Sequence, residues 1–195
     1  SRTTPIRDPQ ILENKIRLAV PEIQEISPSF VSEVMLSGPN AVSGAVLEGV
    51  DIPRWTRVCD ISQQLIAGHL PEDGNQIILG KSLAEKLGVQ VGDEVQIVVP
   101  FSGGDENSAV GTPETRTVQV VGILHFGMHD YDSKYTFMTL EGVQEFLGQP
   151  NQATTFRIKL QDPEQAPEVA AQLTSQYGFP YRVKDWMQLN RNLLY

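Results

Sequence analysis

The sequence predicts an α+β fold in which two strand–helix–strand halves flank a middle piece that is mostly β. An Asp-Pro pair opens a helical pattern near each end of the chain, at Asp8-Pro9 and at Asp162-Pro163. Asp at the cap and Pro at the first helical position are typical of helix N-termini. Between these halves, short apolar runs are separated by turn residues, which indicates strands. The pattern of elements repeats, although the letters do not.

The composition is ordinary for a folded globular protein, and the net charge argues against several classes of function. The chain has 195 residues, of which 40% are hydrophobic and 20% charged, with a formal net charge of -9. This negative charge argues against a nucleic-acid binder and against a protein that lies on anionic membranes. Cys59 is the single cysteine, so an intramolecular disulfide is excluded, and we interpret it as a small buried hydrophobe rather than a reactive thiol. No run of roughly 18 apolar residues and no signal peptide is present.

The first half is predicted to be a helix followed by a two-stranded ribbon. The helix begins at Asp8-Pro9 and ends before Pro21. Residues 23–36 form a long apolar strand, and Pro28 predicts a bend or an edge strand there. A turn at residues 37–40 then returns the chain as a second strand over residues 41–50.

The middle of the chain holds its best punctuated unit, residues 74–100. Residues 51–57 break the strand pattern at Pro53, and residues 60–67 predict a short helix capped by Gly68. Within the unit we expect a strand, a helix, a left-handed cap at a glycine, and a second strand. These elements are residues 77–79, residues 81–87, Gly88 and residues 94–99.

A long polar stretch follows Pro100 and continues to Arg116. Gly, Ser, Asn, Asp and Pro dominate it, so we expect a surface loop. Residues 116–124 alternate as a strand that can pair antiparallel with residues 94–99. The stretch would then be the tip of a protruding hairpin.

The remaining segments complete the second half. We expect a turn-rich stretch over residues 125–134, a short strand over residues 135–138 and a helix over residues 140–147 that is capped by Thr139. A strand follows over residues 154–160, then a helix over residues 162–176 that Asp162-Pro163 opens, and a last strand over residues 179–183. From Trp186 onward an apolar helical face begins that no Gly or Pro ends. We expect it to continue in a longer protein.

The chain carries little that indicates catalysis. His125, His129, Asp130 and Asp132 are the only potential metal cluster, and Gly127 argues against a helix that would bring the histidines together. We interpret them as surface histidines and turn-forming aspartates. No phosphate-binding loop or nucleophile motif is present, and the carboxylate pairs lie in turns. The absence of catalytic motifs favours a binding or coupling module over an enzyme. Trp55 and Trp186 are core anchors or interface residues, and a core position is favoured for Trp186 because it begins an apolar helical face.

Three segments, in order, resemble a known family of membrane permeases. Residues 77–93 resemble the "ILG-x-x-LA-x-x-LG-v-x-x-GD" core of the extracytoplasmic domains of MacB/FtsX-type ABC transporter permeases. Residues 121–132 are similar to the "VGIF-x-x-GM-x-x-x-D" segment of the lipoprotein-releasing LolC/LolE group. Residues 185–190 are similar to that group's "W-x-x-x-N" entry into its second membrane helix, and the resemblance covers essentially the whole chain.

The resemblance implies a periplasmic domain of an inner-membrane permease, without catalytic residues, metal or cofactor. It implies a ferredoxin-like "porter" subdomain from residues 1–50 and 151–195, and an inserted, mostly-β "sabre" subdomain from residues 51–150. A hook hairpin near residues 100–116 would bind a LolA-like periplasmic chaperone or a lipoprotein. The other implied partners are a second permease subunit and a cytosolic ATPase. The hook residues would be Pro100, Phe101, Val110, Gly111, Pro113 and Arg116.

The hook departs from the family's pattern, and two other functions stay open. Val110-Gly111-Thr112-Pro113 replaces a "P-x-G-R-x-P" tip and lacks its arginine, while Asp105 and Glu106 add negative charge. One alternative is the periplasmic domain of a MacB-like exporter or another FtsX-type permease that binds an adaptor or envelope partner. The other is a free-standing metal-dependent hydrolase that would use His125, His129 and Asp130.

Overall fold

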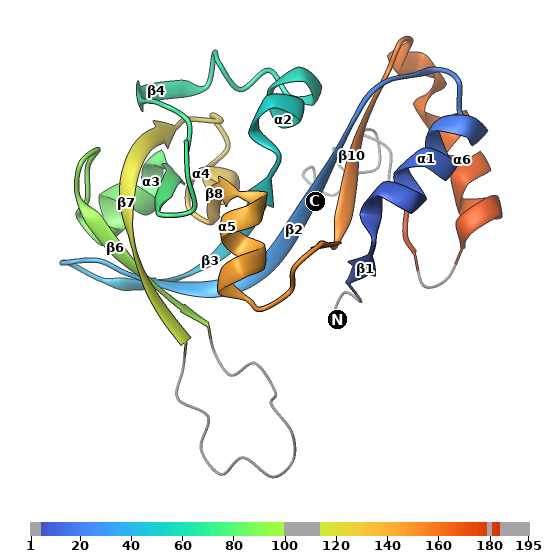
Figure 1. The fold of residues 1–195 in the computed structure, drawn as a ribbon. Coiled ribbons are helices and arrows are strands. Elements are labelled where there is room, and N and C mark those ends of the chain that lie inside the picture. Colours follow the sequence, from blue (N-terminus) through green and yellow to red (C-terminus); the bar gives the residue numbers. More distant parts are fainter. Residues whose placement is uncertain (1–4, 100–113, 179–180, 184–195) are drawn as a thin grey trace, which may run out of the picture.

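An eight-stranded mixed sheet runs through the protein (Figure 1). The computed structural model describes residues 5–99, 114–178 and 181–183. The sheet has the order β10-β2-β3-β8-β5-β7-β4, and β6 pairs with both β2 and β7, while β1 and β9 form a separate pair. The strands are β1 (Ile6–Arg7), β2 (Ile23–Ser37), β3 (Val42–Val50), β4 (Leu65–Gly68), β5 (Gln76–Gly80), β6 (Glu94–Val99), β7 (Glu114–Leu124), β8 (Tyr135–Thr139), β9 (Gln152–Ala153) and β10 (Thr155–Leu160).

Helices from the N-terminal, middle and C-terminal parts of the chain pack against this sheet. They are α1 (Pro9–Ala19), α2 (Ile52–Val58), α3 (Lys81–Leu87), α4 (His129–Asp132), α5 (Leu140–Phe146), the 3-10 turn η1 (Pro163–Gln165) and α6 (Ala166–Tyr177). Strands dominate and helices pack onto them, so the predicted α+β class is confirmed. In the described part of the chain, no helix is long and apolar enough to cross a membrane.

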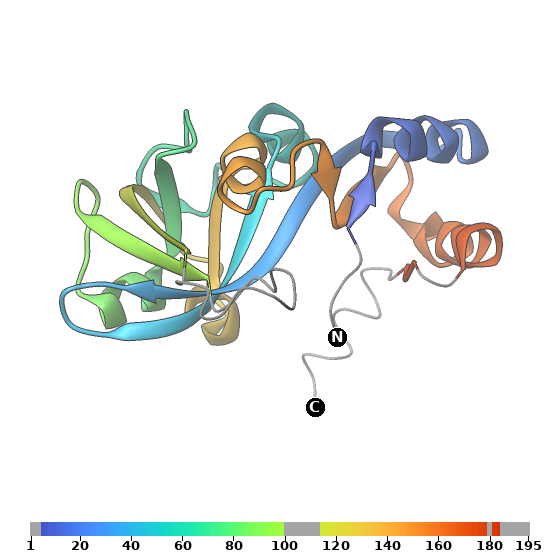
Figure 2. The same cartoon turned by 60° about the horizontal axis from the view of Figure 1, so that its bottom comes forward.

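Strand β2 runs between the two parts of the molecule (Figures 1 and 2). Its first part, up to Ser29, pairs with β10, and its second part, from Ser29 onward, pairs with β3. Before Ser29, therefore, β2 pairs on one side only among the described residues. Pro28 lies on this open stretch, where a missing N–H removes no ladder bond. The edge position expected from Pro28 is confirmed.

The unit at residues 74–100 folds as the sequence predicts. β5 is followed by α3, and Gly88 ends this helix with a left-handed conformation, φ 74°. Its backbone N–H bonds to the Ala84 and Glu85 carbonyls, which satisfies the last turn of the helix. β6 then returns along β2 and β7. This unit supplies much of the largest apolar cluster, in which Ile77, Leu79, Leu83, Leu87 and Ile97 are fully buried.

The buried apolar residues form three clusters. The first joins the second half of β2 and β3 to α3, α5 and the β5–β7 strands. The second lies between α1, α6, β10 and the beginning of β2, and its buried members are Ile16, Val20, Ile23, Ile26, Leu160, Val169 and Leu173. The third surrounds Trp55, whose ring centroid lies 4.7 Å from that of Phe137. Trp55 is therefore a core anchor, whereas Trp186 lies outside the described residues.

The division into residues 1–50 with 151–195 and residues 51–150 stays a prediction. The clusters add one fact that bears on it: β2 contributes Ile23 and Ile26 to the second cluster and Phe30, Val34 and Leu36 to the first. One continuous strand thus belongs to both packing units.

Three local predictions were wrong. The helix expected over residues 60–67 is absent, because residues 65–68 form β4 and pair with β7. A helix occurs instead over residues 52–58, where the Asp51 carboxylate caps the Arg54 N–H at 3.3 Å and Pro53 lies in the first turn, which it tolerates. Residues 181–183, the described end of the expected last strand, belong to no strand.

Candidate partner-binding ribbon

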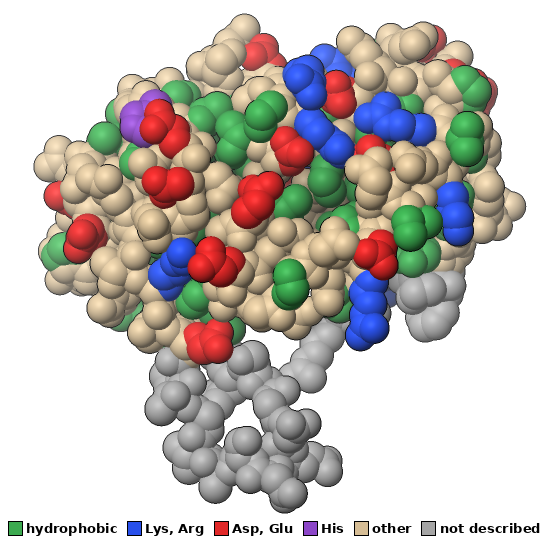
Figure 3. Space-filling view, in the orientation of Figure 1, with side chains coloured by type: hydrophobic (Ala, Val, Ile, Leu, Met, Phe, Trp, Pro, Cys, Tyr) green, Lys and Arg blue, Asp and Glu red, His purple; other side chains and the backbone are tan. Residues whose placement is uncertain are grey.

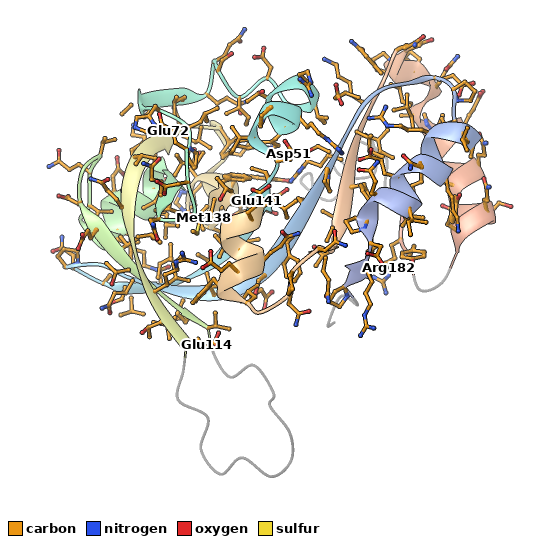
Figure 4. All side chains as sticks on the ribbon, in the orientation of Figure 1. Asp51, Glu72, Glu114, Met138, Glu141 and Arg182 are labelled. Atoms are coloured by element: carbon orange, nitrogen blue, oxygen red, sulfur yellow. The ribbon has the colours of Figure 1, made fainter. Side chains whose placement is uncertain are left out.

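Strands β6 and β7 form the antiparallel ribbon that the sequence predicts. Its register runs from Glu94 opposite Gln119 to Val99 opposite Glu114. Glu114 lies where the described part of the ribbon ends (Figure 4). Segment 100–113 joins the two strand ends, and the predicted hook residues within it lie outside the described residues: Pro100, Phe101, Val110, Gly111 and Pro113.

The base of the ribbon is built into the core. Val95, Ile97 and Val99 alternate inward and are at most 8% exposed. On its other edge β6 pairs with the end of β2, with Ile97 opposite Leu36. A strand that is buried on one face and paired on both edges cannot move without breaking the sheet. The ribbon is therefore a rigid base for whatever segment 100–113 presents.

Arg116 is the one predicted hook residue that the structure describes, and it faces the body of the protein. Its guanidinium donates to the Gly142 carbonyl at 3.3 Å and to the Asn75 side-chain oxygen at 3.2 Å. Beside it the backbones of Gly74 and Gly142 approach so closely that a Cβ on Gly142 would lie 2.7 Å from the Gly74 Cα. Arg116 thus fastens the ribbon to the start of α5 and to the loop before β5.

The exposed side of the ribbon is polar and acidic. Glu94, Gln96, Thr115 and Thr117 lie on this side and are exposed, whereas Glu114, opposite Val99, is exposed at the end of β7 on the other side. Beside them, an open hollow of about 320 Å³ lies between the ribbon and the β2–β3 turn, lined by Ser37, Gly38, Pro39, Glu94, Val95, Gln96 and Thr117. Elsewhere on the face seen in Figure 3, acidic, basic and apolar side chains are interspersed. The ribbon offers hydrogen-bonding groups and negative charge rather than a large apolar surface.

The histidine–aspartate cluster is a structural element of its loop. Asp132 is buried and accepts hydrogen bonds from the Phe126 N–H at 2.7 Å and the Gly127 N–H at 3.2 Å. His125 lies 3.6 Å from the same carboxylate. His129 and Asp130 are exposed. Among the described residues, no group of three or more His, Cys, Asp or Glu side chains could hold a metal ion.

An ion pair between buried Glu48 and partly exposed Arg157 joins β3 to β10, and it was not predicted from the sequence. Arg157 donates from Nε to Glu48 Oε1 at 2.8 Å and from Nη2 to Oε2 at 2.7 Å. Burial alone would lower the pKa of Arg157, but the hydrogen bond and charge of Glu48 outweigh it and raise that pKa. A charged residue inside the apolar run at residues 45–50 was the signal that could have revealed this pair, because such a residue needs a buried partner.

Cys59 ends α2 beside this pair, where it is partly rather than fully buried. Its side chain is half-buried against the cluster around Trp55. Burial raises the pKa of the Cys59 thiol, and the nearby Arg157 charge opposes this rise only in part. A raised pKa disfavours the thiolate, so the thiol is a poor nucleophile.

Comparison with known proteins places most of the chain in one family. A model of the MacB-like periplasmic core domain matches residues 1–176. The lipoprotein-releasing system transmembrane protein LolC of Xylella fastidiosa strain Temecula1 is 31% identical over 178 residues, which is 89% of this chain and 42% of LolC. The corresponding LolE of Haemophilus influenzae is 28% identical over 172 residues, or 86% of this chain and 40% of LolE. The chain thus spans about two fifths of these relatives.

Solved structures show the same fold at low sequence identity. The periplasmic region of MacB from Actinobacillus actinomycetemcomitans superimposes with a TM-score of 0.61 at 15% identity, covering 100% of this chain and 86% of that one. The extracellular domain of the ABC-type transporter YknZ from Gram-positive bacteria gives a TM-score of 0.57 at 16% identity, covering 93% and 87%. The expected fold family is confirmed.

Proposed function

Because the chain belongs to the family of MacB-like periplasmic core domains, we propose that it is the non-catalytic periplasmic part of an inner-membrane ABC permease that releases lipoproteins. In this proposal, ATP hydrolysis in a separate cytosolic subunit moves the membrane helices of the permease. The domain passes that motion on and guides lipoprotein to a LolA-like periplasmic chaperone. A second permease subunit completes the transporter.

The observation that carries the proposal is the sequence similarity to lipoprotein-releasing permeases over most of the chain. LolC relatives from Xylella and Neisseria are 31% and 25% identical over 89% and 85% of this chain. The similarity includes both the α1–β2 half and the ribbon-bearing middle. Identity spread over the whole domain supports the same task for the whole domain, although task follows from sites rather than from fold.

The architecture of the ribbon supports a docking role. Its strands are anchored by buried Val95 and Ile97 and by Arg116, so a movement of the body carries the ribbon along without bending it. Segment 100–113 is then the part that meets the partner. Glu114 directly follows it, and it contains Asp105 and Glu106. We therefore expect a chaperone surface with basic side chains, and binding that weakens as salt rises.

A pull-down with a purified LolA-like chaperone tests the docking role. In the test variant, residues 101–112 are replaced by a short Gly-Ser turn that keeps the β6–β7 register. The wild-type chain should retain the chaperone and this variant should lose it. The matched control is Glu72→Ser, which removes one charge from the exposed loop before β5 and should bind like wild type. If the chaperone binds the shortened ribbon as well as wild type, the ribbon has no docking role.

A MacB-like exporter is the second candidate, because the fold matches the periplasmic region of MacB over the entire chain. There the partner would be a periplasmic adaptor rather than a lipoprotein chaperone. Parallel pull-downs with a purified adaptor and with the chaperone separate the two functions. Retention of the adaptor alone would favour export.

A further inference from the structure

Two packing units meet at the middle of β2, and no buried apolar cluster of the described residues crosses between them. The first unit holds the cluster of α1, α6, β10 and residues 23–29 of β2. The second unit holds the other two clusters and the rest of the sheet. Figures 1 and 2 show β2 running from one unit into the other. Contacts other than apolar packing must therefore hold the two units at a fixed angle.

Helix α2 belongs to the second unit through Trp55, yet its arginines reach the first unit. Arg54 pairs with Glu13 of α1, which is itself 5% exposed, and its Nε donates to the Ile26 carbonyl at 3.2 Å. This carbonyl lies on the stretch of β2 that lacks β3 as a neighbour. Arg57 donates to Glu25 at 3.0 Å. The arginines of α2 thus cross the open edge of β2.

A further ion pair crosses the same junction from β10. Arg157 belongs to the first unit and makes its two hydrogen bonds to Glu48 on β3, in the second. The Glu48 side chain is 1% exposed and the Arg157 side chain 39% exposed. Ser27 lies opposite Arg157 in the strand register, and Val31 lies opposite Glu48. The pair therefore spans the stretch of β2 where its partner changes from β10 to β3.

The hydroxyls of Ser27 and Ser29 lie on that stretch, and both are buried without a hydrogen-bond partner among the described residues. An unpartnered buried hydroxyl disfavours the arrangement that buries it. The junction thus combines charged groups that hold it together with polar groups that gain hydrogen bonds if it opens. This combination is typical of a contact that can switch between two arrangements of the packed units, rather than of a permanently packed core.

We propose that the pairs Arg54–Glu13, Arg57–Glu25 and Arg157–Glu48 form an ionic clamp that fixes the angle between the two units. When the clamp is released, the units turn about β2, which stays continuous. Ion pairs suit this role because they are directional and can be exchanged for water or other charges, whereas an apolar interface would hold the units together in many orientations. The clamp is a property of the junction, whichever partner segment 100–113 binds.

Distance measurements between spin labels on the two units test the clamp. One label replaces exposed Ser175 of α6 and the other replaces exposed Glu85 of α3, in a chain that carries Cys59→Ser. The first test variant combines Glu48→Leu with Arg157→Leu, because replacing both partners leaves no unpaired buried charge. The second combines Arg54→Met with Arg57→Met. Two separate variants keep the test decisive if one of them fails to fold.

The matched control is Lys15→Met, which removes an exposed positive charge from α1 that forms no ion pair in the described part of the chain. We expect one narrow distance distribution in the wild type and in this control. In the clamp variants the distribution should shift or broaden by more than its wild-type width. An unchanged distribution in the folded clamp variants, or equal broadening in the control, would overturn the proposal.

Discussion

Asp132 shows how a charged side chain can organise a loop that contains histidines. Its carboxylate holds the Phe126 and Gly127 amides, and Gly127 takes up the positive φ of 80° that the turn requires. Asp132 is the hydrogen-bond acceptor that the structure gives both amides. Two residues earlier, the carboxylate of exposed Asp130 accepts no hydrogen bond among the described residues.

At this scale, Asp132→Ala should lower the free energy of unfolding by about 2–4 kcal/mol, because it strands two amides that now bond to a charged acceptor. Urea unfolding followed by circular dichroism measures this loss. Asp130→Ala is the matched control, and it should stay within about 0.5 kcal/mol of wild type. Equal losses in the two variants would contradict the structural role of Asp132.

The start of α5 is an element-scale joint for the ribbon. Thr139 caps the helix by accepting from the Gly142 N–H at 3.2 Å, as the sequence predicts. Gly142 then touches the Gly74 backbone, and Arg116 of β7 bonds to the Gly142 carbonyl. A helix end, a loop and a ribbon strand therefore meet where only glycines fit.

Gly142→Ala should destabilise the protein by about 1–3 kcal/mol, because its Cβ would collide with the Gly74 backbone and push α5 away from the ribbon. Helix propensity alone would favour alanine by about 1 kcal/mol, so a net loss isolates the collision. Thermal or urea unfolding gives the value. Glu145→Ala on the exposed side of the same helix serves as the control and should be neutral or slightly stabilising. A stabilised Gly142→Ala variant would show that the contact is loose.

At the scale of the whole molecule, the apolar clusters divide the protein more sharply than its single sheet does. β10 and β7 belong to the same sheet, yet Leu160 of β10 and Val120 of β7 lie in different clusters. Backbone hydrogen bonds and ion pairs connect the two units across β2, whereas apolar burial stabilises each unit separately. Loss of packing in one unit should therefore leave the other largely intact.

Hydrogen exchange measured by mass spectrometry can detect this separation. Leu173→Ala removes a side chain that is 4% exposed in α6 and should cost about 2–5 kcal/mol, which speeds exchange in α1, α6 and β10. Exchange in β5 and β7 should change little. Leu83→Ala, at a fully buried position in α3, should give the reverse pattern. Uniform acceleration in either variant would mean that the molecule opens as one unit.

The sequence by itself determined the elements whose causes are local. Residues 74–100 were predicted almost residue by residue, since apolar spacing, a glycine cap and turn residues act within a few positions. The pairing of β6 with β7 followed from the same patterns. The Asp51 cap was equally local, but Pro53 was interpreted as a break rather than as a first-turn residue, and the helix was expected too late.

Only the tertiary structure decided what depends on residues far apart in the chain. Glu48 and Arg157 are 109 positions apart, and neither has a local pattern that names its partner. The hydrogen bond between Arg116 and the Gly142 carbonyl is likewise one that no spacing rule predicts, and the partner-binding role of Arg116 stays a prediction. β2 pairs with β10 up to Ser29 and with β3 from Ser29 onward, because its two halves pack in two different apolar clusters. Local patterns fix the backbone of each element, whereas long-range packing decides which charged side chains meet.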